Sequence, residues 1–453
     1  MKPTVTNSYL PLKSGAAASE TSFGVSLLAL LLTFATMTAL CFAGVSSALA
    51  MSIVLILSFL LYSVLLETLF FPKTCALRQL KVRRHLSWRR VLFREVALLA
   101  TLSAIAFCGW LFPAFSDPNK TQLGDLFVKT FYPFAAFWAG AMLIGGIPYF
   151  CIMDRLDPEE EDVLCRIGRT LLTGRLSVTR FELANYARTW LVKAFYLAIM
   201  HPLMINKIQY FMQASWWSFA GRPSEYPFWL AYDFLYLVDV TIGTTGYALA
   251  FKLINTQTRS ADPTLLGWAS ALFCYWPFFD ILTGRYFLPY YESPTGFGLF
   301  TGGGVPVVVW GSLTFLFGVL YVASDISFGT RASNLSYRGL TNTGLYRLTK
   351  HPASVFKAIH WWLLYLPFLT NSGAEAVRYS VLLLLLNGVY YLRARTEERH
   401  LSHYPEYVAY ALEMNRKSIF RGVARLLPFL VYRPPKEEDL VFRVSSPDLA
   451  RGV

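Results

Sequence analysis

Charged residues are scarce in this chain. Only 15% of its 453 residues are Asp, Glu, Lys or Arg, whereas 55% are hydrophobic. A soluble domain carries about 25% charged residues, so this composition excludes an ordinary soluble globular protein. Several apolar runs approach the ~20 residues that cross a bilayer as a helix, and the short alternating segments of a membrane β-barrel are absent. The sequence therefore predicts an all-α, polytopic helical membrane protein.

Cysteines are also few, and no two of the six form a C-x-x-C pair. Their scatter excludes a disulfide framework and gives no zinc motif, so we expect no metal. The net charge is +13, but no basic segment has a recognisable nucleic-acid-binding fold. We therefore expect no nucleic acid partner, and we assign the positive charge to loops that face the cytoplasm and anionic membrane lipid.

The apolar runs predict about ten transmembrane helices. They lie at residues 23–43, 46–70, 95–115, 128–152, 189–204, 227–253, 264–282, 305–324, 353–370 and 377–392. Segment 73–94 holds eight Lys or Arg residues and no acid, so the positive-inside rule places it in the cytoplasm. Alternation along the chain then places the basic segments 153–188 and 325–352 on the same side. Both termini are expected to be cytoplasmic.

The chain divides by character into three expected regions. Residues 1–204 form an N-terminal transmembrane region of unknown role, residues 205–420 carry the chemistry, and residues 421–453 form a cytoplasmic tail. The second region contains Asp233 and Asp239 within one expected span. A carboxylate in hydrocarbon is costly unless it is paired or faces water, which makes both functional candidates. They point to different helix faces, and Asp239 is the stronger candidate; the alternative is a hydrogen bond between helices.

A polar constellation surrounds the last two expected spans. The chain crosses at 353–370, turns at 371–373 and returns at 377–392, so this C-terminal helical hairpin brings two polar clusters to one cytoplasmic face. Basic groups there could bind an anionic group, and acidic groups could bind an ammonium or ribose hydroxyls. Aromatic rings could bind a cation or an adenine. The groups are Arg347, His351, Arg393, Arg395, Glu397, Glu398, Tyr346, Tyr390, Tyr391 and Trp361.

These groups are compatible with S-adenosylmethionine, which has an adenosine, a carboxylate, an ammonium and a sulfonium. The alternative is a solvated helix face, in which Arg393 pairs with Glu397 and Arg395 with Glu398, next to basic residues that contact lipid phosphate.

The segment "SNLSYRGLTNTGLYRLTKHP … WW … N … YYLRARTEERHL … YPEYVAY" resembles the isoprenylcysteine carboxyl methyltransferase family over residues 330–415. The resemblance implies an integral-membrane methyltransferase with a cytoplasmic S-adenosylmethionine site and a lipid-like or prenylated acceptor that enters from the bilayer. By motif position the implied cofactor-site residues are Tyr346, His351, Pro352, Arg393, Glu397 and Glu398. To these we add Tyr391 for the cofactor site, and Arg347, His351 and Arg395 as predicted catalytic residues.

Ser354 and Phe356 depart from the family pattern, in which an aromatic and then a small residue stand at these positions. This departure leaves the acceptor open: a prenylated-cysteine carboxylate, a phospholipid amine or a lipid phosphate. Two other functions also remain open. The sterol-reductase superfamily has a related hairpin and uses NADPH, whereas a transporter would need a polar path at mid-membrane.

Overall fold

The computed structural model describes residues 19–70, 81–111, 127–157, 159–213, 225–276, 278–279, 295–300, 304–370 and 372–435. These residues are mostly helical. The longer helices are α1 (Phe23–Phe42), α2 (Ala48–Phe70), α3 (Trp88–Leu111), α5 (Tyr132–Leu156), α6 (Val163–Thr173), α7 (Arg180–Met212), α8 (Tyr226–Ala248), α11 (Val305–Ile326), α12 (Pro352–Tyr365), α13 (Gly373–Leu401) and α14 (Pro405–Lys417). The short helices are α9 (Leu265–Leu272), α10 (Gly296–Leu299) and α15 (Arg421–Leu426).

Two very short strands and several single helical turns complete the described chain. Strand β1 (Ser260–Ala261) pairs antiparallel with β2 (Ser336–Tyr337). The turns are η3 (Phe127–Phe131), η4 (Lys252–Ile254), η7 (Gly329–Arg331), η8 (Gly344–Arg347) and η9 (Pro428–Leu430). The strand pair matters because it brings the loop after α8 against the loop that precedes α12.

Local signals explain where several helices begin. Thr179 and Glu182 form a reciprocal capping box at the start of α7, and Asp162 caps α6 through the backbone N–H of Cys165. Pro352 and Pro405 stand at the first positions of α12 and α14, where the missing proline N–H breaks no hydrogen bond. These starts are local, so they follow from the sequence alone.

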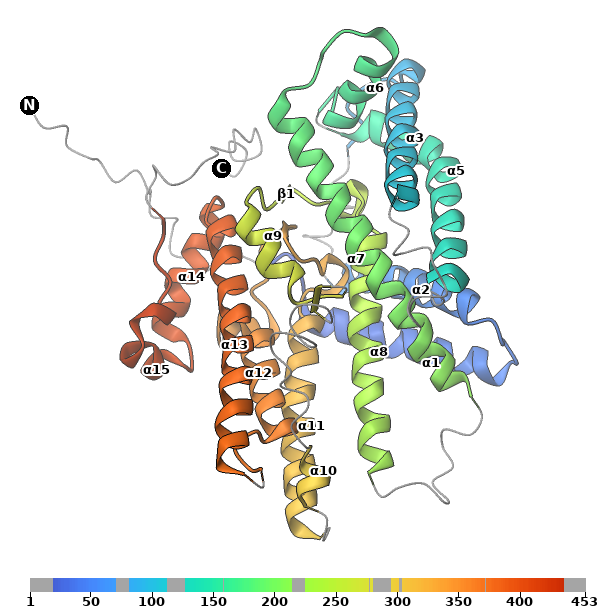
Figure 1. Cartoon of the computed structure of the whole chain (residues 1–453). Coiled ribbons are helices and arrows are strands. Elements are labelled where there is room, and N and C mark those ends of the chain that lie inside the picture. Colours follow the sequence, from blue (N-terminus) through green and yellow to red (C-terminus); the bar gives the residue numbers. More distant parts are fainter. Residues whose placement is uncertain are drawn as a thin grey trace, which may run out of the picture.

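The helices form two groups that α7 connects (Figure 1). Helices α3, α5 and α6 pack together at one end, whereas α8, α11, α12 and α13 form the body that includes the last two expected spans. α1 and α2 pack against this body through a core that contains Met51 of α2, Met204 of α7 and Leu237 of α8. The N-terminal helices and the C-terminal body therefore share one hydrophobic core.

The boundary expected after residue 204 lies within this shared core. That boundary falls inside α7, which runs without interruption from Arg180 to Met212. Met204 and Ile208 lie on either side of the boundary, and both are fully buried in the same cluster. The expected tail, residues 421–453, contains α15 and η9, and residues 436–453 lie outside the described residues.

The predicted count of ten spans is not confirmed. Among the described residues, six helices are long and apolar enough to cross a membrane: Phe23–Phe42, Ala48–Phe70, Trp88–Gly109, Val128–Leu156, Arg180–Met212 and Val305–Ile326. This is compatible with an integral membrane protein. The expected span at 264–282 begins with α9, which has only 8 residues. At about 1.5 Å per residue it is about 12 Å long, too short for a bilayer core of about 30 Å.

The expected C-terminal hairpin corresponds to α12 and α13, which contact each other through Trp361 and Tyr390 at a ring separation of 5.3 Å. α12 has 14 residues and, at about 1.5 Å per residue, is about 21 Å long. It is short for a full span, so a hairpin of two complete spans is not confirmed. Residues 1–18 and 436–453, on which the expected orientation of the termini depends, lie outside the described residues.

Candidate functional site

The join between His351 and Pro352 positions the first group of the site. Proline disfavours helical geometry in the residue before it. His351 accordingly has φ −129° and ψ 59° and lies just before the first turn of α12. Its imidazole Nε2 is 3.0 Å from Oε1 of Glu398 on α13. Two residues 47 positions apart are therefore in direct contact, as the sequence predicted when it placed their clusters on one face.

Glu398 is the centre of a cluster of four charged or polar side chains. The ammonium of Lys350 lies 2.8 Å from Glu398 Oε1, and the Arg395 guanidinium donates to Oε2. The Glu398 side chain is only 5% exposed. Burial by itself would raise the pKa of Glu398, but the hydrogen bond from His351 and the charges of His351 and Lys350 outweigh it and lower that pKa to about 2. Glu398 is therefore an ionised carboxylate whose oxygens are already engaged by His351, Lys350 and Arg395.

The expected tail takes part in this cluster. The Lys350 ammonium lies over the ring of Tyr432, 5.3 Å from its centroid. The hydroxyl groups of Tyr432 and Ser402 are 2.6 Å apart, which holds the tail against the end of α13. Tyr432 has no feature in its sequence surroundings that predicts this contact.

The side chain of Glu397 points away from that of Glu398, because adjacent residues on a helix point about 100° apart. It is exposed at a small cavity between α9, β2 and α13. Arg393 also lines this cavity; its guanidinium donates to Asn334 Oδ1 and lies 5.6 Å over the ring of Tyr275. The cavity volume is about 20 Å³, room for roughly one water molecule. Glu397 and Glu398, although adjacent in sequence, therefore contact different groups.

His400 closes one side of the same cavity. Its Nε2 is 2.9 Å from the hydroxyl of Ser260, the first residue of β1. Burial lowers the pKa of His400 to about 4, so its imidazole is neutral at neutral pH. Asp262 also lines the cavity and accepts hydrogen bonds from the backbone N–H and hydroxyl of Thr264. The cavity therefore presents two carboxylates, one guanidinium and a neutral imidazole.

The other predicted site residues lie outside these two groups of contacts. Arg347 is exposed and donates weakly to the carbonyl of Asn342, at 3.5 Å. The Tyr391 hydroxyl donates to the carbonyl of Phe429, 2.9 Å away, so this ring faces the tail. Tyr346 is buried against Phe328, with ring centroids 4.9 Å apart. Pro352 is buried at the start of α12.

The two intramembrane candidates have different partners, as their spacing predicted. Asp233 forms an ion pair with Lys207 of α7. Asp239 accepts a hydrogen bond from the hydroxyl of Tyr321 on α11, at 2.9 Å. Asp325 and Lys357, which were not among the predicted residues, lie near Asp239. A charged residue inside or beside an apolar run was the signal that could have found them.

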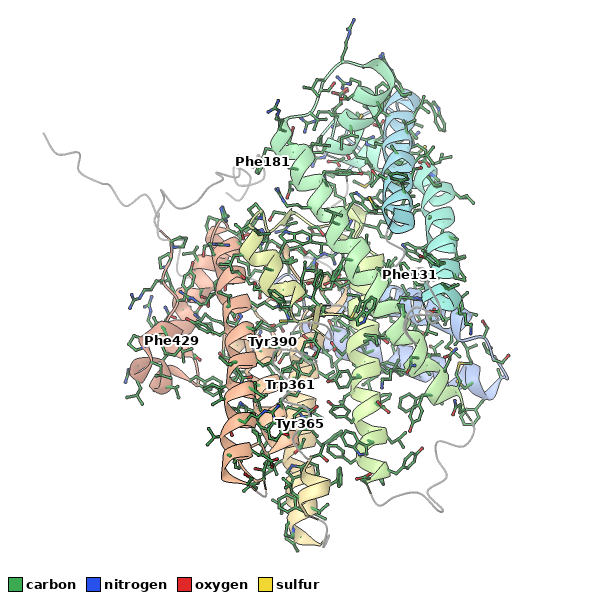
Figure 2. The ribbon with its side chains drawn as sticks, viewed as in Figure 1. Phe131, Phe181, Trp361, Tyr365, Tyr390 and Phe429 are labelled. Atoms are coloured by element: carbon green, nitrogen blue, oxygen red, sulfur yellow. The ribbon has the colours of Figure 1, made fainter. Side chains whose placement is uncertain are left out.

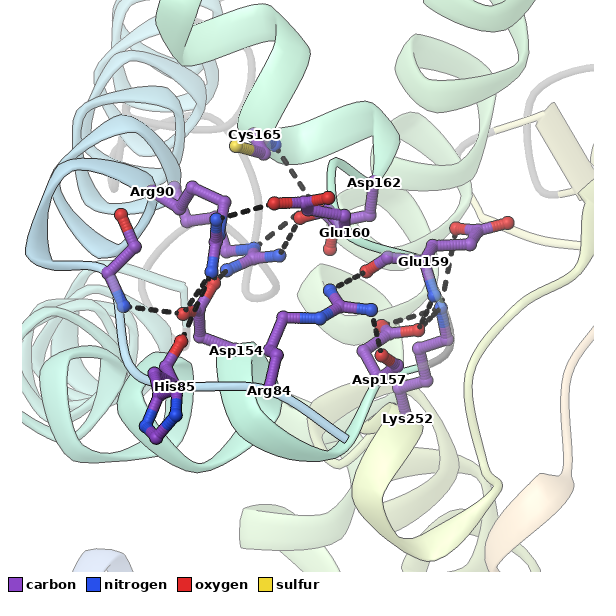
Figure 3. A network of polar contacts seen from close by, with 12 residues as sticks. Arg84, His85, Arg90, Asp154, Asp157, Glu159, Glu160, Asp162, Cys165 and Lys252 are labelled. Carbon is purple, nitrogen blue, oxygen red and sulfur yellow. Dashed lines mark hydrogen bonds and ion pairs between the residues drawn. The ribbon is translucent and has the colours of Figure 1, made fainter. Parts of the chain in front are cut away.

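A second polar network lies in the N-terminal region, between α3, α5 and α6 (Figure 3). Asp154 accepts from Arg90 at 2.7 Å and 3.0 Å, from Arg94 at 2.9 Å and from the backbone of Ser87 at 2.8 Å. The side chains of Asp154 and Arg94 are fully buried. Nearby, Lys252 of η4 pairs with Asp157 at 2.7 Å and so joins this region to the loop after α8.

No group of three or more His, Cys, Asp or Glu side chains that could hold a metal ion occurs in the part of the chain that the structure describes. Residues 306–413 match a protein family described as "Protein of unknown function (DUF1295)". This match covers α11 to α14, which includes His351, Arg393 and Glu398 but excludes the Asp154 network. No curated protein matches the chain. No solved structure matches it either.

Proposed function

We propose that the protein is an S-adenosylmethionine-dependent methyltransferase that acts on a membrane-embedded, lipid-like acceptor. The observation that carries this proposal is the cavity at α13, where Arg393 and Glu397 present opposite charges one helical turn apart. The amino-acid part of the cofactor has a carboxylate for the Arg393 guanidinium and an ammonium for the Glu397 carboxylate. The donor set therefore fits this group.

The charge of the cavity favours this cofactor over NADPH. Its lining has two carboxylates, Asp262 and Glu397, against the single guanidinium of Arg393. Two further cations lie near this lining: Arg188 is within electrostatic reach of Asp262 and His400, and Arg399 donates to the Thr264 hydroxyl. Lys350 and Arg395 are both engaged by Glu398. A dinucleotide with a diphosphate and a 2′-phosphate would add several negative charges next to these carboxylates. A cationic sulfonium ligand meets no such repulsion.

The residues of the chain have distinct tasks in this proposal. Arg393 and Glu397 hold the amino-acid part of the cofactor, which supplies a methyl group on a positively charged sulfur. The Glu398 cluster fixes α13 against the start of α12 and so keeps Arg393 in place. Because the cavity has room for roughly one water molecule, ligand binding requires α9 or β2 to move away from α13. Closure would then exclude water and align the acceptor, which can lower the barrier by several kcal/mol.

Calorimetry on the detergent-purified chain tests the proposal. S-adenosylhomocysteine and NADPH would be titrated separately, into the parent protein and into the Glu397→Gln variant. We expect heat of binding for S-adenosylhomocysteine only, and a loss of affinity of at least tenfold in the variant. Binding of NADPH instead would favour a sterol-reductase-like enzyme. Binding of neither would leave a transporter or another non-enzymatic role as the better hypothesis.

The finer expectations belong to the same proposal. The resemblance implies a prenylated-cysteine carboxylate as one acceptor, beside the phospholipid amine and the lipid phosphate that the sequence leaves open, and the loop charges imply cytoplasmic termini. Reporter fusions at residues 10 and 450 test the orientation, since a reporter on the opposite side at either end would contradict it.

A further inference from the structure

Four polar side chains from three helices meet inside the body of the protein. Asp239 of α8 accepts the hydrogen bond from the Tyr321 hydroxyl on α11, at 2.9 Å. The carboxyl groups of Asp239 and Asp325 are close enough to share a hydrogen bond, which requires one of them to hold a proton. Lys357 of α12 lies within electrostatic reach of both. The pair therefore carries about one negative charge and can accept one more proton.

The ammonium of Lys357 lies among three aromatic rings. Its Nζ is 4.9 Å from the ring centroid of Tyr321, 5.2 Å from that of Trp361 and 5.5 Å from that of Tyr390. Figure 2 shows Trp361 and Tyr390 in the region where α12 and α13 run together. Aromatic faces attract ammonium groups, and more strongly where water is excluded. These surroundings stabilise an alkylammonium group, here that of Lys357 itself.

Asp325 and Lys357 lie near the ends of their helices, at the depth in a membrane expected for a lipid headgroup rather than for an acyl chain. Asp325 is one residue from the end of α11, and Lys357 is five residues after Pro352 at the start of α12. At about 1.5 Å per residue, Lys357 lies about 7–8 Å along α12 from the end where His351 contacts Glu398. An acceptor nitrogen at this depth would be close to the polar end of the helices, beside the cofactor cavity.

Arg393 lies between the cavity at α13 and the Asp239–Asp325 pair and interacts with both. It lines the cavity together with Glu397, and it lies within electrostatic reach of Asp239, Asp325 and Lys357. Other titratable groups that face the cluster are Tyr236 of α8, Tyr346 of η8 and, from the turn after α9, Cys274 and Tyr275. The cofactor cavity and the Asp239–Asp325 pair are therefore neighbouring parts of one polar region.

We propose that the Asp239–Asp325 pair is the acid–base group of the methyl transfer and that the acceptor is a lipid with a primary amine headgroup. This inference rests on the proposed function. The amine nitrogen forms the new bond to the methyl carbon, and the bond between that carbon and the sulfonium sulfur breaks with its electrons on sulfur. The proton from nitrogen goes to the carboxylate pair. A carboxylate acceptor releases no proton and would give this pair no task.

The test uses the full-length protein in vesicles that contain either phosphatidylethanolamine or phosphatidylcholine as the only phospholipid, with a prenylated cysteine as a separate acceptor. The variants are Asp239→Asn/Asp325→Asn and, as a matched control on the same helix, Asp233→Asn, whose partner is Lys207. Transfer of a labelled methyl group is measured in parallel with calorimetric binding of S-adenosylhomocysteine and of a short-chain phosphatidylethanolamine without cofactor.

We expect the parent and Asp233→Asn to methylate phosphatidylethanolamine and to bind its short-chain form. In the double variant, the rate of methyl transfer and the affinity for short-chain phosphatidylethanolamine should each fall at least tenfold. Its affinity for S-adenosylhomocysteine should stay within twofold of the parent. Methylation of the prenylated cysteine alone would overturn the amine acceptor and leave the proposed function standing. Absence of S-adenosylhomocysteine binding in the parent would instead overturn the proposed function itself.

A pH profile of the parent gives a second measurement that needs no folded variant. A free alkylamine loses its proton near pH 10, so without an internal base the rate should rise about tenfold per pH unit up to that value. With the carboxylate pair as base, we expect the rate to level off well before the pH at which a free alkylamine loses its proton. A continuous rise to about pH 10 would overturn the acid–base role.

Discussion

Two buried carboxylates, Asp154 in the N-terminal region and Glu398 at the C-terminal site, are each held by several basic side chains. At Asp154 one of the two arginine partners, Arg94, is as completely buried as the carboxylate itself. At Glu398 two of the three basic partners are more open, since Arg395 is 33% exposed and His351 20% exposed, whereas Lys350 is 11% exposed. Glu398 also lies one residue from Glu397, which faces a cavity. The first network joins α3, α5 and α6, whereas the second lies beside a cavity in which a ligand could bind.

The difference shows that burial and charge alone do not identify a functional site. Both carboxylates are satisfied inside the protein, so both networks stabilise contacts between helices. What distinguishes the Glu398 region is that its neighbours Arg393 and Glu397 still face a cavity. Substitutions in the two networks should therefore separate stability from ligand binding.

Replacement of Asp154 should have the largest effect. Asp154→Ala leaves the fully buried Arg94 and the largely buried Arg90 without their carboxylate, and loss of one partner of a buried pair costs about 3–5 kcal/mol of unfolding free energy. Thermal unfolding of the purified protein would measure this loss. The control is Glu160→Gln, because Glu160 is 67% exposed and pairs with the same Arg90. Equal melting temperatures for Asp154→Ala and the control would contradict a structural role for the network.

Replacement of Glu398 should act mainly on ligand binding. Glu398→Gln weakens the charge-assisted hydrogen bonds to Lys350, His351 and Arg395, which releases α13 from the start of α12. We expect the variant to insert normally and to lose about 1.5–3 kcal/mol of S-adenosylhomocysteine binding. Glu413→Gln, which alters an exposed pair on α14, is the control. Parent-like affinity in Glu398→Gln would mean that the cluster does not support the cofactor site.

The pH dependence of stability should separate the same variant from the parent. The pKa of Glu398 is lowered from 4.5 to about 2, so its stabilisation is fully present above about pH 4.5 and is lost as the pH falls towards 2. The difference in melting temperature between the parent and Glu398→Gln should therefore shrink over this range. A difference that stays constant from pH 5 to about pH 2 would show that Glu398 is not ionised in the folded protein.

Replacement of His351 asks whether charge alone is sufficient at the start of α12. His351→Lys keeps a positive group near Glu398 but loses the flat imidazole whose Nε2 lies 3.0 Å from Oε1. We expect normal insertion, and a loss of about tenfold in S-adenosylhomocysteine affinity, or about 1.4 kcal/mol, together with most methyl transfer. Activity close to that of the parent would show that this position needs only charge.

Arg347 should give the smallest effect. The sequence predicted it as a catalytic residue, but its exposed guanidinium has only a 3.5 Å contact to the carbonyl of Asn342. We expect Arg347→Ala to change S-adenosylhomocysteine affinity by less than twofold, because surface substitutions away from a site have little effect. A tenfold loss would place Arg347 in the site after a movement of η8.

The candidate site was predictable where sequence neighbours act together. The contact between His351 and Glu398 followed from two motifs expected on one face, and Pro352 set the geometry of His351 through its own ring. Sequence neighbours did not predict which glutamate of the segment RTEER, residues 395–399, faces the cavity. Whether Glu397 or Glu398 faces inward depends on the rotation of α13 about its axis, which packing against α9 and α12 determines.

The sequence by itself determined the helical class, because its long apolar runs and scarce charge leave no other stable structure in lipid. It also determined the starts of α7 and α12, because caps and prolines act on adjacent residues. Only the tertiary structure decided that α1 and α2 share a core with α8, and that Lys357 meets Asp239 and Asp325. Partners on different helices are selected by helix rotation and crossing, which depend on the packing of all helices together rather than on spacing within one of them.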